Sequence, residues 1–185
     1  MATFTADLFM SLDGFGTGPV AYWGKEGPEL LEERARSFFA AEGQTLVFGA
    51  NTYREMAKFA AAAGDDRNFA ALNAAPKVVI SRSLGGSLGM QNSSLIAEDA
   101  LEAVPRLKAE SPLPLRCHGS ISMNRALLAA GLVDRLEVMV FPAITGATGS
   151  DPILADLPDI DLELVGSRLF DGQVQQLVYV PGAHA

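Results

Sequence analysis

Short polar segments that follow predicted strands carry the residues best suited to bind a phosphate. The clearest begins at His118-Gly119-Ser120, where the apolar run from Leu115 to Cys117 stops and a helical pattern over residues 122–130 follows. A strand that turns at Gly and Ser into a helix aims unpaired backbone N–H groups at one point, and the helix dipole favours negative charge there. The sequence therefore predicts an anion site at Gly119, Ser120 and Ile121, suited to the phosphates of a nucleotide.

Three further segments of this kind follow other predicted strands: Ser11-Leu12-Asp13-Gly14-Phe15, Gly49-Ala50-Asn51-Thr52-Tyr53 and Ile80-Ser81-Arg82-Ser83. Taken alone, a glycine after a strand usually indicates ordinary turn chemistry. In open α/β sheets, however, ligands bind at the carboxyl ends of the strands. All four segments are expected at that edge, which favours one site built from several turns.

The elements that position these turns alternate between strand and helix until about residue 140. The predicted strands are residues 4–11, 45–48, 77–81, 115–117 and 136–140, and the predicted helices are residues 28–43, 51–63, 98–109 and 122–130. Residues 82–93 and 145–161 are expected to be loops, and a hairpin is expected around Asp171-Gly172. This order predicts a single α/β domain over residues 1–185. Its sheet is mainly parallel, with helices on both faces and a C-terminal antiparallel hairpin at one edge.

The motifs, in their order and spacing, resemble the dihydrofolate reductase superfamily. The similarity is greatest to the reductase domain of riboflavin-biosynthesis deaminase-reductases and its stand-alone relatives. It covers nearly the whole chain and rests on the segments SLDGF, GANTY, KVVISRSL, HGSISMNRALLAAGLVDRLEVMVFPAITG and FDGQVQQLVY. The resemblance implies an NADPH-dependent reductase that transfers a hydride to a small planar heterocyclic or carbonyl substrate.

The resemblance also implies which residues hold the cofactor. They are Gly49, Asn51, Thr52, Ser81, Arg82, Gly119, Ser120 and Ile121. Ser81 and Arg82 match positions that hold the 2′-phosphate in relatives, and a guanidinium can grip that group with two hydrogen bonds.

The chain departs from the family pattern at three of its positions. Ser120 replaces the second glycine of a pair, Ala50 replaces an Arg that grips cofactor phosphate, and Arg135 replaces a Glu. A serine at this turn is still expected to cap the helix. Its Cβ nevertheless restricts the closest approach of a pyrophosphate. Arg54 is a candidate substitute for the missing Arg.

The catalytic group is less well defined by the sequence. Asp13 matches the family's SLDG aspartate, and a turn residue that hydrogen-bonds its own backbone is an equally good interpretation. Phe15, Tyr22 and Trp23 are expected to line the substrate pocket, because Trp23 lies in a polar, glycine-rich stretch and its ring can stack on a planar ligand. A lone His118 at a strand end is more often structural. The sequence shows no metal-binding spacing.

Composition limits the classes of partner. The chain has 185 residues with 14 Lys plus Arg against 22 Asp plus Glu, a formal charge of −8. This balance argues against nucleic acid as a partner. The N-terminus lacks a secretory signal pattern and no apolar run reaches about 18 residues, so we expect a cytoplasmic protein without membrane spans. The single cysteine, Cys117, is expected to be a buried small hydrophobe.

Two alternatives to an enzyme belong to other functional classes. Ala50 and Ser120 favour a degenerate nucleotide-binding module without turnover. An exposed sheet edge would favour an interaction domain. Riboflavin-pathway relatives commonly dimerise, so a homodimer is expected, with the apolar strand Leu136 to Phe141 helping to bury the shared surface.

Overall fold

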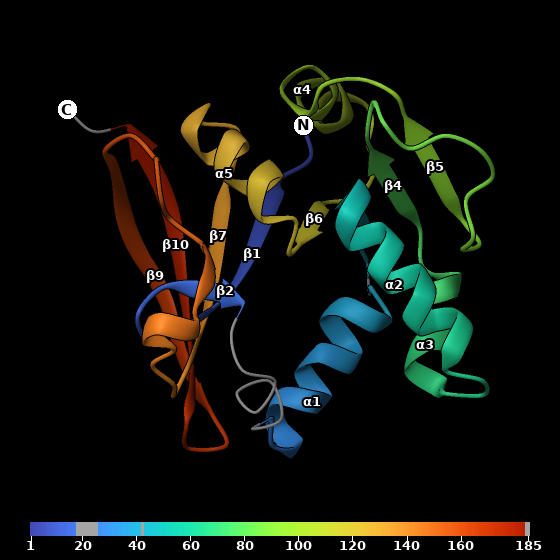
Figure 1. The fold of residues 1–185 in the computed structure, drawn as a ribbon. Coiled ribbons are helices and arrows are strands. Elements are labelled where there is room, and N and C mark those ends of the chain that lie inside the picture. Colours follow the sequence, from blue (N-terminus) through green and yellow to red (C-terminus); the bar gives the residue numbers. More distant parts are fainter. Residues whose placement is uncertain (18–25, 42, 184–185) are drawn as a thin grey trace.

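The computed structural model describes residues 1–17, 26–41 and 43–183. Its main sheet has eight strands in the order β5-β4-β3-β6-β1-β7-β10-β9 (Figure 1). The first six in this order are parallel: β5 (Ser93–Ile96), β4 (Lys77–Ile80), β3 (Thr45–Gly49), β6 (Leu115–His118), β1 (Phe4–Ser11) and β7 (Arg135–Phe141). A second, two-stranded sheet pairs β2 (Phe15–Thr17) with β8 (Ser150–Pro152).

The antiparallel edge comes from the C-terminal hairpin, as predicted. Strand β10 (Val174–Ala183) pairs with β7, and β9 (Ile160–Phe170) pairs with β10. The two residues of the turn, Asp171 and Gly172, have φ values of 51° and 69°. Two consecutive positive φ angles match the twist of the flanking strands, which explains why an Asp-Gly pair occurs here.

Helices cover both faces of the sheet. On one face lie α4 (Ala100–Glu110) and α5 (Ile121–Ala129), packed over a core that includes Phe4, Ala6 and Leu8 of β1. The opposite face carries α1 (Pro28–Arg34), which continues as a π-helical turn over Ala35–Phe39, together with α2 (Ala50–Ala62) and α3 (Arg67–Ala74) (Figure 1). Their core includes Phe38, Phe48 and Leu72. Because side chains alternate along a strand, Ala6 and Leu8 point to one face while Asp7 and Phe9 point to the other.

Several elements were not predicted from the sequence. Helix α3 begins at Asp66, whose carboxylate accepts hydrogen bonds from the N–H groups of Asn68 and Phe69. Strand β5 follows the loop predicted over residues 82–93, and the segment 145–161 contains a 3-10 turn, Gly146–Thr148, and strand β8. Among the described residues, no helix combines the length and apolar character needed to cross a lipid bilayer.

The expected role of residues 136–141 in a dimer surface is wrong. Strand β7 lies inside the sheet, with β1 on one side and β10 on the other. Leu136, Val138 and Phe141 are buried within this chain. Both hydrogen-bonding edges of β7 are therefore used within the chain.

Candidate functional site

Two of the predicted turns meet at the carboxyl edge of the sheet. Strands β3 and β6 are neighbours, so the β3–α2 turn at Gly49 lies beside the β6–α5 turn at Gly119 and Ser120. The Gly49 N–H donates to Ser120 Oγ at 3.0 Å. The N–H and the hydroxyl of Ser120 both donate to Thr52 Oγ1, at 3.1 and 3.0 Å. Four predicted cofactor residues are thus brought together.

The β6–α5 turn depends on two left-handed residues. Gly119 has φ +77° and Ser120 has φ +54°. Glycine adopts this conformation freely, whereas serine is strained there by about 1–2 kcal/mol. The Ser120 side chain does not cap α5 as expected, and instead reaches across to Gly49. Ser120 therefore links the N-termini of α2 and α5. Its hydroxyl oxygen also accepts the hydrogen bond that the Gly49 N–H could otherwise donate to a phosphate.

The remaining predicted cofactor residues surround these turns. Asn51 Oδ1 accepts from Arg54 Nη1 at 3.1 Å, which holds a guanidinium at the start of α2. Ile121 opens α5, and its side chain packs partly against the core.

Ser81 and Arg82 follow β4, one strand further along the same edge. Ser81 Oγ accepts from the N–H groups of Ser83 and Leu84, so it closes its own turn. The Arg82 side chain is 74% exposed and has one ion pair, 3.4 Å from Asp99. Its guanidinium is therefore available to a solvent-side ligand.

Asp13 holds two loops together. Its carboxylate accepts from the Ser11 hydroxyl at 2.6 Å and from the N–H groups of Thr145 and Gly146. These bonds, led by that of Ser11, hold the pKa of Asp13 well below its ordinary value. Asp13 therefore joins its own turn to a loop more than a hundred residues away, which neither sequence interpretation predicted, and a catalytic role for Asp13 stays a prediction.

We expect Asp13→Asn to lower the melting temperature at about pH 7. A carboxylate whose pKa is depressed on folding contributes stability above its unfolded pKa and loses it as the pH falls through the folded value. The difference between Asp13→Asn and the unmodified chain should therefore shrink toward about pH 3. Thermal unfolding followed by circular dichroism at both pH values checks this. A difference that grows on acidification would contradict the assigned role.

The predicted substrate residues are only partly covered by the structure. Tyr22 and Trp23 lie outside the described residues. Phe15 belongs to β2, and its ring packs so closely on Gly149 that a Cβ there would lie 2.7 Å from it. A narrow cleft lies between α1 and the sheet, and Phe15 is not among the residues that line it.

A buried charged network beneath α1 was not predicted. Arg116 of β6 binds Asp7 of β1 through Nε at 2.7 Å and Nη2 at 2.8 Å, and it binds Glu137 of β7 at 2.6 Å. His118 Nδ1 lies 2.8 Å from Asp7 Oδ2. Arg135, the departure from the family's Glu, binds the other oxygen of Glu137 at 2.9 Å. Strand register explains the grouping, because Asp7 is opposite both His118 and Glu137.

The protonation states of this network follow from burial and charge. Burial alone would raise the pKa of Asp7, but Arg116 and His118 hold it below its ordinary value. Burial lowers the pKa of His118, although Asp7 opposes that effect. Asp7 is therefore a carboxylate and His118 is neutral at pH 7.

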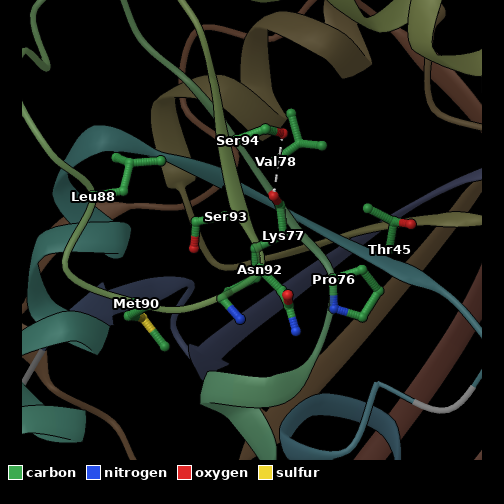
Figure 2. A pocket seen from close by; sticks show the side chains of 9 residues that line it. All are labelled: Thr45, Pro76, Lys77, Val78, Leu88, Met90, Asn92, Ser93 and Ser94. Atoms are coloured by element: carbon green, nitrogen blue, oxygen red, sulfur yellow. Dashed lines mark hydrogen bonds between the residues drawn. The ribbon is translucent and has the colours of Figure 1, made fainter.

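An open hollow lies at the opposite end of the sheet. Figure 2 shows its lining at the amino ends of β3, β4 and β5, with Thr45, Lys77 and Ser93 among the residues. The Lys77 Nζ donates to the carbonyl groups of Leu72, Asn73 and Ala75 at the end of α3. Its charge is therefore used within the fold, and this hollow is remote from the turns at the carboxyl edge.

The strand order, with helices on both faces of the sheet and an antiparallel hairpin at one edge, defines a dihydrofolate-reductase-like α/β fold. A structure of dihydrofolate reductase from Enterococcus faecalis, complexed with NADP(H) and RAB-propyl, superposes with a TM-score of 0.63 at 12% identity, covering 98% of this chain and 97% of that chain. The sequence profile of the RibD C-terminal domain matches residues 2–176. The chain therefore belongs to the RibD C-terminal domain family, whose members are typically NADPH-dependent reductases.

Other solved structures share the fold. A putative riboflavin biosynthesis protein from Shewanella sp. PV-4 has a TM-score of 0.76 and 17% identity, covering 98% of this chain and 99% of that chain. A diaminohydroxyphosphoribosylaminopyrimidine deaminase/5-amino-6-(5-phosphoribosylamino)uracil reductase from Thermotoga maritima has a TM-score of 0.66 and 13% identity, covering 98% of this chain and 57% of that chain.

Among curated proteins, the uncharacterized protein YyaP of Bacillus subtilis (strain 168) is 29% identical over 85 residues. That match covers 45% of this chain and 44% of YyaP, so it spans less than half of the relative's length.

Proposed function

We propose that this chain is an NADPH-dependent reductase that transfers a hydride to a small planar heterocyclic or carbonyl substrate. The observation that carries the proposal is the meeting of two helix N-termini, at Gly49 and Ser120, in a member of the RibD C-terminal domain family. Free N–H groups at such termini favour phosphate oxygens. When bound, the reduced nicotinamide supplies the hydride, while the protein orients the reactants and excludes water.

The donor set at the edge fits a dinucleotide phosphate in charge and conformation. Gly119 has φ +77°, a conformation that glycine adopts without strain, and its lack of a Cβ lets a ligand approach the backbone closely. Arg82 is exposed beside Ser81, where a 2′-phosphate would be held. Titration calorimetry with NADPH and NADH tests the proposal. Saturable binding that favours NADPH is expected, and absence of nucleotide binding would contradict it.

Ser120→Gly is expected to bind NADPH more tightly by about three- to tenfold. The substitution frees the Gly49 N–H, and one net hydrogen bond is worth about 0.5–1.5 kcal/mol. Ser120→Ala is the matched control, because it frees the same N–H but keeps the Cβ. A gain in Ser120→Gly alone would assign the effect to the Cβ. Weaker binding by both variants would show that the Ser120 hydroxyl assists the cofactor.

A nucleotide-binding module without turnover is the second candidate. It is favoured by the Ser120 hydroxyl, which satisfies the Gly49 N–H within the protein. The two candidates differ in one observable property. The module binds NADPH but leaves its absorbance unchanged with any carbonyl or heterocyclic substrate, whereas the reductase oxidises it.

We also propose a homodimer, with the shared surface on the C-terminal hairpin rather than on β7. Strand β9 is the edge of the main sheet, and its Leu164 and Leu169 are 55% and 56% exposed. A long edge strand with exposed apolar side chains readily pairs with another chain. Sedimentation equilibrium should give a dimer for the unmodified chain and a monomer for Leu164→Lys/Leu169→Lys. Leu101→Lys on α4 is the control, and a concentration-independent monomer for the unmodified chain would contradict the proposal.

A further inference from the structure

A fully buried asparagine lies on the core-facing side of α5, close to the β6–α5 turn. Helix α5 buries Met123, Asn124, Leu127 and Leu128, and Asn124 is 0% exposed. The other three residues are apolar, as expected for the face of a helix that packs on a sheet. Asparagine is also a poor residue for a helix interior. Neither apolar packing nor helix propensity therefore explains Asn124.

The side-chain amide of Asn124 holds the turn through two carbonyl groups. Its Nδ2 donates to the Gly119 carbonyl at 2.5 Å and to the Asp7 carbonyl, on β1, at 3.2 Å. The Gly119 N–H also donates to the Asp7 carbonyl, at 3.3 Å. Both neighbours of the amide are acceptors, so its nitrogen rather than its oxygen must face them. The peptide groups on both sides of Gly119 are therefore fixed to β1 and α5.

The orientation of the second of these peptide groups decides what the turn presents at the carboxyl edge. The bond between Gly119 and Ser120 is trans, so its C=O and N–H groups point in opposite directions. Asn124 draws the carbonyl oxygen into the core, and the Ser120 N–H consequently points to Thr52 at the start of α2. With this peptide turned over, the carbonyl oxygen would face the edge and repel a phosphate, because it carries partial negative charge.

The turn needs this support because its backbone is strained. Gly119 and Ser120 are both left-handed, with φ +77° and +54°. A left-handed serine persists only where the surrounding structure holds it. On the core side of the turn that support is the Asn124 amide. A weaker bond runs from the Cys117 thiol to the same Gly119 carbonyl, at 3.7 Å.

The oxygen of the same amide supplies an independent observation. Among the described residues, none forms a hydrogen bond with Asn124 Oδ1, although this oxygen is buried. A buried acceptor without a partner lowers stability, because it loses its bonds to water without replacement. An apolar side chain of similar size would avoid that loss. What Asn124 contributes, and an apolar residue could not, is the hold on two carbonyl groups.

We propose that Asn124 is a positioning residue of the anion site at the β6–α5 turn. Its Nδ2 holds the Gly119–Ser120 peptide so that N–H groups, rather than a carbonyl oxygen, face the ligand. Asn124 is buried, so it acts through Gly119 and Ser120 and not by contact with the cofactor. Its effect on NADPH affinity rests on the proposed function, whereas its hold on the turn is a property of the ligand-free chain.

Asn124→Leu tests the proposal, because leucine has nearly the same size and branching but no donor. In the ligand-free chain, Ser120 should leave the left-handed conformation, as reported by the ³J coupling between its amide and α protons and by its ¹³C shifts. NADPH affinity, measured by calorimetry, should fall by about three- to tenfold, because losing one net hydrogen bond lowers the populated fraction of the binding-competent turn by about that factor.

Leu127→Ala is the matched control, because Leu127 is buried on the same face of α5 and the substitution opens a cavity there. It should lower the melting temperature while leaving the Ser120 φ angle and the NADPH affinity unchanged. If it weakens NADPH binding as much as Asn124→Leu does, the effect is one of general stability and the proposal is overturned.

The proposal is also overturned if Ser120 keeps its left-handed φ angle in folded Asn124→Leu. Should that variant fail to fold, hydrogen exchange of the Asn124 side-chain amide in the unmodified chain decides. Strong protection is expected, and exchange as fast as that of the exposed Asn68 side chain would contradict the two bonds. An unmodified chain that binds no NADPH would reject the proposed function, and the φ measurement would still decide whether Asn124 holds the turn.

Discussion

Replacing Arg116 with methionine is expected to lower the free energy of unfolding by about 3–5 kcal/mol. The change leaves Asp7 and Glu137 without their central cation, and these side chains are only 3% and 9% exposed. Removing one partner of a buried ion pair lowers stability far more than replacing the whole pair with apolar residues, because the remaining charge is desolvated without compensation. Urea unfolding followed by circular dichroism measures the loss.

Arg135→Met is the matched control for that experiment. Arg135 also binds Glu137, at 2.9 Å, but its side chain is 47% exposed. Exposed ion pairs contribute about 0–1 kcal/mol, so its loss should fall in that range. Equal losses of unfolding free energy in the two variants would show that burial does not determine how much Arg116 contributes to stability. A loss below about 1 kcal/mol for Arg116→Met would contradict the network as a stabilising unit.

Arg82→Ala is expected to weaken NADPH binding by about ten- to hundredfold, because a hydrogen bond to a charged group is worth about 1.5–3 kcal/mol. NADH presents only a hydroxyl at the same place, so its affinity should change much less. The present partner of Arg82 is Asp99, at 3.4 Å, and the Arg82 side chain is 74% exposed. An exposed pair of this kind is too weak to hold the guanidinium away from a phosphate.

Paired calorimetric titrations of both cofactors test the role of Arg82. Arg106→Ala is the control, because Arg106 is exposed, pairs with Glu98 and is not among the predicted cofactor residues. Equal affinity of the unmodified chain for NADPH and NADH would rule out recognition of the 2′-phosphate by Arg82. An equal loss for both cofactors in Arg82→Ala would do the same.

Local sequence signals predicted most of the fold. The alternation of strands and helices predicted the parallel sheet, and Asp171-Gly172 predicted the hairpin. Both signals can be identified from residues that are close together in the sequence. Cys117, at the end of an apolar run, is fully buried as expected. Strand β5 was missed because it is a short sheet-edge element that begins with two serines. Helix α3 was missed although Asp66 is a readable cap, since an alanine-rich stretch gives little apolar periodicity.

The candidate site divides in the same way. The turns at Gly49 and Gly119 were found because glycine chemistry is local. The network of Asp7, Arg116 and Glu137 was missed, because it depends on the register of strands more than a hundred residues apart in sequence. The available signal was one charged residue in each of three apolar strands: Asp7, Arg116 and Glu137. Because the sequence does not show that His118 lies opposite Asp7, it favoured only a structural role for His118.

NADPH titration of ¹⁵N-labelled protein, followed through backbone amide shifts, locates the bound cofactor on the fold. We expect saturable shifts at the carboxyl edge of the sheet, at Gly49, Thr52, Ser81, Gly119 and Ser120. These amides belong to three turns that converge only in the folded chain. Saturable shifts confined to the hollow at the opposite end, around Thr45, Lys77 and Ser93, or no saturable shifts at all, would contradict it.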